Sequence, residues 1–266
     1  MLVRLLVLFT SMALYSSESV HAFDTSGIED PKVRACADRS IPQDTMRQTQ
    51  MVKVVGGNGF VRESIREIFW RRFTQEDSRV LIRVLEPQRD RGLAVLINDH
   101  ENEQFPKYSM YSPELKRVRR VTGESFFGSI LGTDFTYEDF SYFYRVDERE
   151  KVTRIDDDTV DGHDAYVLET VKQVADSNYL TVRFYIDKHY CLPVRSDFIA
   201  VNGDLRKQLL VARDKIAKVD NHWVPFHTTM VDFKHETRSE FIVEKIIINP
   251  ELDASMFSNS ALSRSR

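Results

Sequence analysis

The stretch Tyr179–Asp187 reads YLTVRFYID, and its apolar side chains occupy alternate positions. These side chains are Leu180, Val182, Phe184 and Ile186. Because successive side chains of a β-strand point to opposite faces, this spacing predicts a strand with one strongly apolar face directed inward. A sheet built from such strands has an apolar face that must be covered.

Short runs of this kind, separated by turn residues, extend over Met46–Ile248. Asp161-Gly162 and Asn202-Gly203 are dipeptides typical of tight hairpin turns. No regular alternation of strands with helices is visible, so we predict an antiparallel meander of about ten strands, interrupted once. Before it, residues 28–38 include an early proline, Pro31, and predict one short helix.

The run Lys53–Arg62, KVVGGNGFVR, raises the alternative of a nucleotide-binding loop. A dinucleotide fingerprint needs three glycines at fixed places between a strand and a helix. Gly57 and Gly59 fill two of these places, but Arg62 stands at the third. We therefore interpret Gly56–Gly59 as a hairpin connection between two strands.

The first 22 residues have the pattern of an export signal. Arg4 forms a short positive region, Leu5–Leu14 is apolar, and Val20-His21-Ala22 provides a cleavage site. We expect one mature domain over residues 23–266, located in the periplasm. No later run reaches the ~20 apolar residues that a membrane helix needs, so we expect the mature chain not to span a membrane.

Two cysteines, Cys36 and Cys191, would enter an oxidising compartment after export. They could form a disulfide, or they could remain two partly buried thiols. The sequence leaves both alternatives open, because it does not show whether the two Cα atoms approach within ~6 Å.

Charge and motifs argue against several functional classes. The chain has a formal net charge of −4, without the basic excess typical of nucleic-acid-binding proteins. It contains neither a G-x-S-x-G nucleophile motif nor an H-E-x-x-H metal motif. Helix capping and surface solvation explain Glu138 and Asp139, and Asp156–Asp158 is interpreted as a solvated turn. We expect no enzymatic activity, no catalytic residue, no metal and no cofactor.

The interruption of the meander is Val121–Tyr144, VTGESFFGSILGTDFTYEDFSYFY, which we call the central segment. Its density of apolar side chains is too high for a solvated loop, so the segment should pack onto another part of the protein. Thr136 together with Asp139 can cap a short helix over Tyr137–Phe143.

A basic run lies just before the central segment and comprises Lys116, Arg117, Arg119 and Arg120. In one interpretation it is a charged sheet edge that discourages aggregation. In the other, these side chains contact lipid headgroup phosphates or an acidic surface of a partner.

Several motifs along the chain carry a family resemblance. They are Pro113–Arg120 (PELKRVRR), Gly128-Ser129, Gly132–Asp139 (GTDFTYED), Asp161-Gly162, Leu192–Arg195 (LPVR), Trp223–Pro225 (WVP) and Phe257. Together they resemble the outer-membrane lipoprotein-sorting protein family, which is related to the LolA and LolB carriers. The resemblance covers nearly the whole mature chain. It implies a mainly β fold, with a single curved antiparallel sheet forming a half-open β-barrel, an N-terminal helix and a short helical lid.

The resemblance also implies a function: a periplasmic carrier or chaperone that shields acyl chains of a lipid or lipoprotein during transfer toward the outer membrane. Physical reasoning leaves two alternatives, because a curved sheet of this size either fills its own interior or keeps a cavity for an apolar ligand. In such a cavity each acyl methylene contributes roughly 0.8 kcal/mol. The candidate ligand-binding residues are Leu115, Val118, Phe126, Phe127, Ile130, Leu131, Phe135, Tyr137 and Phe140.

An alternative function belongs to the interaction class. The chain would be an accessory subunit that docks on an inner-membrane exporter of the resistance-nodulation-division type through the same apolar central segment. A carrier should take up lipid in isolation, whereas a docking subunit should only copurify with its exporter.

Overall fold

The computed structural model describes residues 30–39, 44–74, 77–100, 106–144, 151–171 and 177–264. The predicted export signal over residues 1–22 lies outside the described residues. None of the helices in the described ranges combines the length and the apolar character that crossing a bilayer requires.

The helical elements are α1 (Pro31–Arg39), η1 (Gly123–Phe127), α2 (Tyr137–Tyr144), η2 (Arg213–Lys215), η3 (Ala254–Phe257) and α3 (Asn259–Leu262). The first eight strands are β1 (Thr45–Val55), β2 (Val61–Arg72), β3 (Asp77–Glu86), β4 (Ala94–His100), β5 (Lys107–Ser112), β6 (Arg117–Arg120), β7 (Lys151–Val160) and β8 (His163–Val171). The others are β9 (Tyr179–Asp187), β10 (Pro193–Ala200), β11 (Leu205–Val211), β12 (Ile216–Val219), β13 (His222–Pro225), β14 (His227–Asp232) and β15 (Thr237–Ile248).

In the described part of the chain, thirteen strands form one antiparallel sheet in the order β6-β5-β4-β3-β2-β1-β15-β14-β11-β10-β9-β8-β7. Two meanders make up this sheet. The first consists of β1–β6, the second of β7–β11, β14 and β15, and they join where β15 pairs with β1. The edge strands are β6 and β7, so the sheet is not closed. A separate hairpin consists of β12 and β13. The strands outnumber the ten predicted, because four-residue strands such as β6 carry too short an alternation to be recognised.

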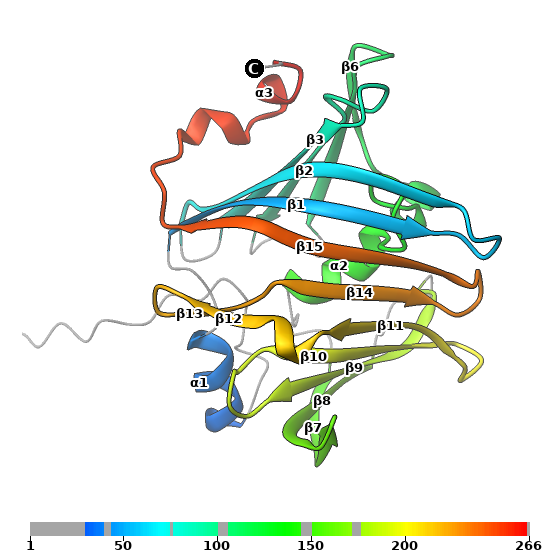
Figure 1. The fold of residues 1–266 in the computed structure, drawn as a ribbon, viewed down its shortest axis with the longest axis vertical. Helices are drawn as coiled ribbons and strands as arrows, with labels where there is room; N and C mark the ends of the chain where they lie inside the picture. The colour runs from blue at the N-terminus through cyan, green and yellow to red at the C-terminus, as the bar shows by residue number, and fades with distance from the viewer. Residues whose placement is uncertain are drawn as a thin grey trace, which may run out of the picture.

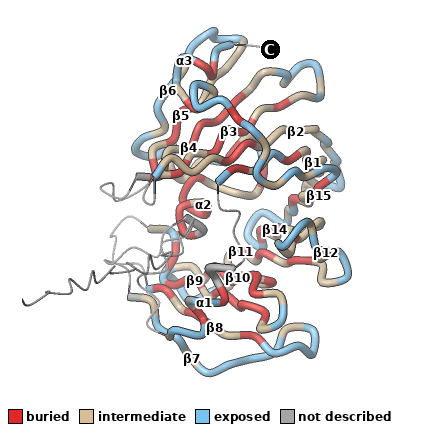
Figure 2. Tube along the Cα trace, turned by 90° about the vertical axis from the view of Figure 1, so that its left-hand side faces the viewer, coloured by how far each residue is buried: buried red, intermediate tan, exposed pale blue. Residues whose placement is uncertain are grey.

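The connection between the two meanders starts at one edge of the sheet and ends at the other. The chain leaves β6, passes through the central segment and α2, and enters β7. The sheet curves around α2, which lies on its concave side (Figures 1 and 2). The topology therefore carries the central segment across the concave side.

The predicted hairpins are confirmed. Gly56–Gly59 connects β1 to β2, which pair with each other in register, and no helix follows the glycines. Asp161 and Gly162 between β7 and β8 have positive φ angles of 51° and 77°, the left-handed conformation that a tight turn of this kind needs. Gly203 between β10 and β11 has φ 88°.

Strand β9 has the predicted bounds, but side chains on both of its faces are buried. Val182, Phe184 and Ile186 belong to a large core cluster on one face, and Tyr185 packs with residues of β8 on the other. Leu180 was expected to point inward but is 47% exposed. Its position explains this, because the pairing of β9 with β8 ends at Thr181.

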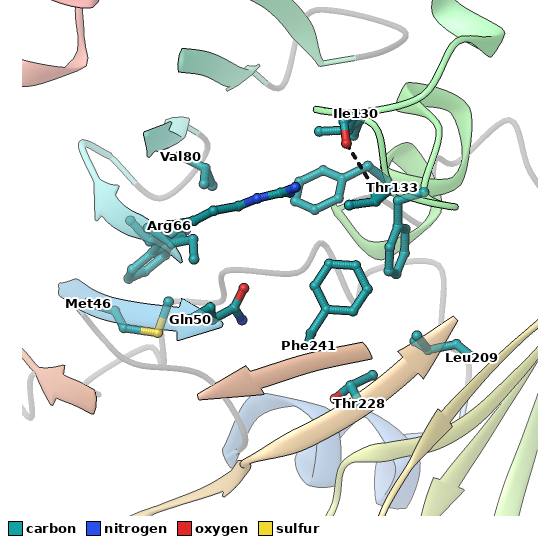
Figure 3. Close-up of a pocket in the computed structure, with 13 residues that line it drawn as sticks. Met46, Gln50, Arg66, Val80, Ile130, Thr133, Leu209, Thr228 and Phe241 are labelled. Carbon is teal, nitrogen blue, oxygen red and sulfur yellow. Dashed lines mark hydrogen bonds between the residues drawn. The ribbon is translucent and has the colours of Figure 1, made fainter. Parts of the chain in front are cut away.

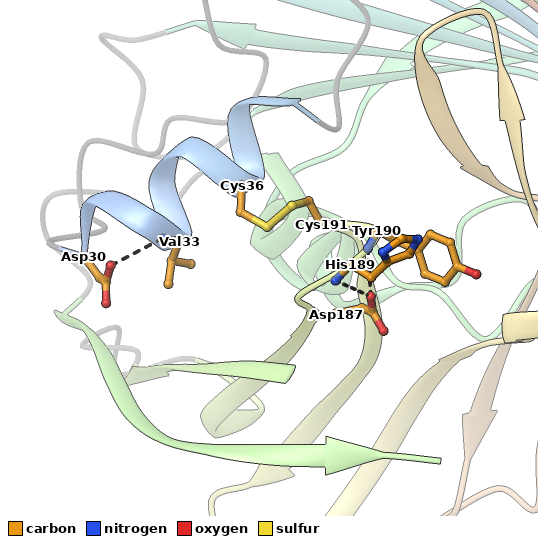
Figure 4. The surroundings of a disulfide bond; sticks show 7 residues. All are labelled: Asp30, Val33, Cys36, Asp187, His189, Tyr190 and Cys191. Carbon is orange, nitrogen blue, oxygen red and sulfur yellow. Dashed lines mark hydrogen bonds between the residues drawn. A yellow bond between two sulfur atoms is a disulfide. The ribbon is translucent and has the colours of Figure 1, made fainter. Parts of the chain in front are cut away.

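Helix α1 is joined to the sheet by a disulfide between Cys36 and Cys191, whose Cα atoms are 5.0 Å apart (Figure 4). The Asp30 carboxylate accepts a hydrogen bond from the Lys32 amide at 2.8 Å, which caps the helix. On the other side, Asp187 accepts hydrogen bonds from the amides of the turn that leads to Cys191. The disulfide thus holds the predicted helix against the second meander.

The acidic run Asp156–Asp158 is not the turn that we expected. It lies within β7, at a bulge in the pairing with β8. Asp157 forms ion pairs with Arg154 and with Lys188. The turn follows at Asp161-Gly162, where two adjacent residues adopt positive φ.

The convex side of the first meander is covered by the C-terminal elements η3 and α3. Phe257 is fully buried there, and its ring packs edge-on against Phe73 at 5.8 Å between centroids. Arg79 donates a hydrogen bond to the carbonyl of Phe257 at 3.0 Å, and Arg83 donates one to the carbonyl of Ala261 at 2.8 Å. Both faces of β2–β4 are therefore buried.

Candidate functional site

A pocket of about 290 Å³ lies on the concave side, between the sheet and the central segment (Figure 3). Its lining is mostly apolar, and its volume is at the lower end of the range for ligand sites. The sheet contributes Met46, Gln50, Arg66, Ile68, Trp70, Val80, Leu209, Thr228 and Phe241, and the central segment contributes Ile130, Thr133, Phe135 and Phe140.

Strand periodicity builds the floor of the pocket. Arg66, Ile68 and Trp70 follow one another at every second position of β2 and therefore share a face. Across the sheet, Thr228 of β14 lies opposite Phe241 of β15. The floor thus spans the junction where the two meanders meet.

The roof is the central segment, whose conformation is fixed by local hydrogen bonds. Thr136 and Asp139 form a reciprocal cap: Thr136 Oγ1 accepts from the Asp139 amide at 3.1 Å, and the Asp139 carboxylate accepts from the Thr136 amide at 2.8 Å. This confirms the predicted start of the helix. Gly132 has φ 72°, a left-handed conformation that glycine adopts without steric cost, and the Arg62 guanidinium lies against it.

A buried ion pair ties α2 to the second meander. Lys207 Nζ of β11 lies 2.7 Å from Asp139 Oδ2, and the two side chains are only 3% and 0% exposed. Tyr179 donates a hydrogen bond to Asp139 Oδ1 at 2.5 Å. Burial, together with the negative charge of Asp139, raises the pKa of the Tyr179 phenol well above its usual range, so the phenol stays protonated.

The two neighbouring carboxylates reinforce this anchorage. Glu138 is 1% exposed and accepts hydrogen bonds from the side chains of Ser177 and Asn178, both at 2.7 Å. Asp134 accepts one from Ser239 at 2.6 Å. The expectation that Glu138 and Asp139 are surface-solvated was therefore wrong, because a helix placed inside a curved sheet has no solvent-facing side at these positions.

Arg66 differs from the other polar groups of the site. Its side chain reaches across the pocket toward the loop that carries Ile130 and Thr133 (Figure 3), and the residue is only 5% exposed. It donates to Ser64 Oγ at 3.1 Å and to the carbonyl of Leu131 at 3.0 Å. Burial, followed by repulsion from Arg62, lowers the pKa of its guanidinium to about 10.

Three of the nine residues expected to bind ligand line this pocket: Ile130, Phe135 and Phe140. Phe126, Leu131 and Tyr137 lie in or against the adjacent core cluster, and Phe127 packs edge-on against Phe126. Leu115 is 49% exposed, and Val118 packs against the convex-side cluster with Phe257.

The basic run lies at the edge of the sheet, with Arg117–Arg120 forming the edge strand β6. Lys116 is in the turn before it, with φ 49°. None of the four side chains is among those that line the pocket. Their position is that of the charged sheet edge in our first interpretation.

Sequence reasoning missed Arg66, Trp70, Lys207 and Phe241. Alternation along β2 could have placed Arg66 on the same face as Ile68 and Trp70, since the three residues occupy every second position of the strand. No local signal identifies Lys207 as the partner of Asp139, which lies 68 positions away. Among the described residues, no group of three or more His, Cys, Asp or Glu side chains is arranged to hold a metal ion.

Comparison with known protein families and structures gives one family match. A family model with the description "-like: Uncharacterized protein" matches residues 76–264. No curated protein matches the chain.

Several solved structures are similar over most of their length. A domain assigned to an outer membrane lipoprotein-sorting protein from Vibrio parahaemolyticus superposes with a TM-score of 0.79 at 20% identity, covering 88% of this chain and 97% of that domain. A DUF1329 family protein from Desulfovibrio piger gives 0.79 at 22% identity, covering 87% and 96%. A LolA superfamily protein from Nitrosomonas europaea gives 0.62 at 16% identity, covering 85% and 96%. The fold is therefore LolA-like.

Proposed function

The chain belongs to the protein family whose model matches residues 76–264 and has a LolA-like fold, and we propose that it is a periplasmic carrier for the acyl chains of a lipid or lipoprotein. In this proposal the curved sheet acts as a half-open barrel. The central segment is its lid, and the pocket beneath the lid shields hydrocarbon from water on the way to the outer membrane.

The observation that carries the proposal is the apolar pocket between the floor of the sheet and the central segment. Its lining includes Ile68, Trp70, Phe135, Phe140 and Phe241. Each acyl methylene that leaves water for such a site contributes about 0.8 kcal/mol. A chain of about a dozen carbons would therefore bind with a useful affinity after the cost of ordering it.

The lid would open at its first half rather than at α2. The second half is held by the buried pair of Asp139 with Lys207 and by the contacts of Glu138 and Asp134. In contrast, η1 contains no buried residue. We expect η1, with Phe126 and Phe127, to move outward and admit the acyl chain while α2 remains in place.

A direct test is lipid content and uptake. Extraction of the purified protein with organic solvent should yield bound lipid in mass spectrometry, and the emptied protein should take up a fluorescent fatty acid. Thr228→Trp fills the pocket and should abolish uptake. Thr229→Trp on the opposite face of β14 is the matched control and should retain it. Recovery of no lipid together with no uptake would exclude a carrier.

The exporter-docking alternative would use the exposed part of the same segment. Phe127 is half-buried and does not line the pocket, so Phe127→Asp separates the two functions. If the chain is a carrier only, the variant keeps the protein's association with any membrane exporter unchanged. If the chain is a docking subunit instead, the wild type copurifies with the exporter and the variant does not.

A further inference from the structure

Arg66 is a buried cation without an anionic partner. Burying a charged group is costly unless an opposite charge or a full set of hydrogen bonds offsets the loss of water. Among the described residues, no carboxylate forms an ion pair with Arg66. Asp90 raises its pKa slightly through space, but its own ion pair is with Arg89.

Several buried or partly buried cations of this protein are paired with carboxylates, whereas Arg66 is not. Lys207 is paired with Asp139. Arg206 and Arg213, which are one-fifth exposed, are paired with Asp232 and Asp187 respectively. The guanidinium of Arg72 also has no hydrogen-bond acceptor in the described part of the chain and lies over the Trp70 ring instead. Arg66, in contrast, lines the pocket.

The guanidinium also retains unused hydrogen-bond donors. Of its five N–H groups, one on Nε and one on Nη2 are directed at Ser64 Oγ and the Leu131 carbonyl. No described residue accepts a hydrogen bond from Nη1. Gln50, which lies opposite Arg66 in the pairing of β1 with β2, also lines the pocket and can provide an amide donor.

We propose that Arg66 binds the anionic head of an amphiphile, either a carboxylate or a phosphate, whose hydrocarbon chain lies in the pocket against Trp70 and Phe241. The inference rests on the proposed function and specifies its ligand class. A guanidinium fork matches the oxygen spacing of both carboxylate and phosphate.

The test compares heads on one hydrocarbon chain. Dodecanoate, dodecyl phosphate and 1-dodecanol are titrated against the emptied full-length mature protein, with displacement of a fluorescent fatty acid as the readout. Charge-assisted hydrogen bonds contribute about 1.5–3 kcal/mol, so we expect both anions to bind roughly tenfold or more tightly than the alcohol. The order of the two anions identifies the source: a preference for carboxylate indicates free fatty acids, and a preference for phosphate indicates phospholipids.

Three variants assign the effect to one side chain. Arg66→Gln should weaken binding of both anions about tenfold or more and leave the alcohol unchanged, whereas Arg66→Lys should restore part of the loss. Arg62→Gln is the matched control, because Arg62 donates to the adjacent carbonyl of Gly132 but does not line the pocket. It should keep the preference for anions.

Equal binding of the three ligands by the wild type would overturn the inference while leaving the carrier function intact. So would a uniform loss of all three ligands in a folded Arg66→Gln variant. Failure of the wild type to bind any of them would instead contradict the proposed function. The wild-type comparison does not depend on the folding of the variants. Circular dichroism checks separately that each variant is folded.

Discussion

Replacing Arg66 with methionine should stabilise the empty protein. The fall of the Arg66 pKa from its usual value to about 10, at about 1.4 kcal/mol per pH unit, means that burying the charged form costs the folded state roughly 3 kcal/mol. The variant loses the hydrogen bonds to Ser64 Oγ and to the Leu131 carbonyl, which are worth about 1 kcal/mol each, while the methionine side chain fills the same space. We expect a net gain of about 1 kcal/mol in the free energy of unfolding.

Urea denaturation of lipid-free protein measures this change as a higher midpoint at an unchanged slope. The melting temperature should rise by roughly 2–4 °C for a domain of this size. Arg62→Met is the control and should change the free energy of unfolding by less than about 1 kcal/mol, because Arg62 is partly exposed. A lower unfolding free energy for Arg66→Met than for Arg62→Met would refute the reasoning, since the buried charge would then stabilise the fold.

Three further predictions concern the anchorage of the central segment and of α1. Lys207→Met should lower the unfolding free energy by about 3–5 kcal/mol in denaturant titrations, because it leaves Asp139 buried without its partner; a loss below 1 kcal/mol would contradict this. Cys36→Ser with Cys191→Ser opens a loop of 155 residues and should cost at most about 5 kcal/mol, measured as a lower melting temperature under oxidising conditions; an unchanged melting temperature would contradict it. Burial raises the Tyr137 pKa to about 12, so the stability that its protonated phenol contributes is fully present below pH 10 and is lost as the pH rises toward 12. The unfolding free energy of the wild type should therefore fall by about 3 kcal/mol more over that range than that of Tyr137→Phe. Identical pH profiles of the two proteins would rule this out.

Much of the fold could be read from local patterns. The alternation in Tyr179–Asp187 placed β9 at its observed bounds, and Asp161-Gly162 placed a hairpin. Thr136 placed the start of α2. These features depend on residues close in sequence, whose steric preferences act in any context. Local patterns failed where burial depends on distant residues, as they did for the exposed Leu180.

The candidate site could be predicted only in part. The central segment was identified as a cover from its apolar composition, and Ile130, Phe135 and Phe140 line the pocket. Its floor comes from strands far apart in the chain, so its composition depends on the pairing of β1 with β15. Leu115 and Val118 were included because they adjoin the central segment in sequence, but neither lines the pocket.

By itself, the sequence determined the class of the protein: a chain of alternating strands with one apolar cover, whose hairpins are set by short-range sterics. Tertiary structure decided which charges have partners. Asp139 meets Lys207 across 68 positions, whereas Arg66 of β2 meets only neutral oxygens. The physical reason is that desolvation and ion pairing depend on what surrounds a side chain in space, and in a thirteen-stranded sheet these surroundings come from residues distant in sequence.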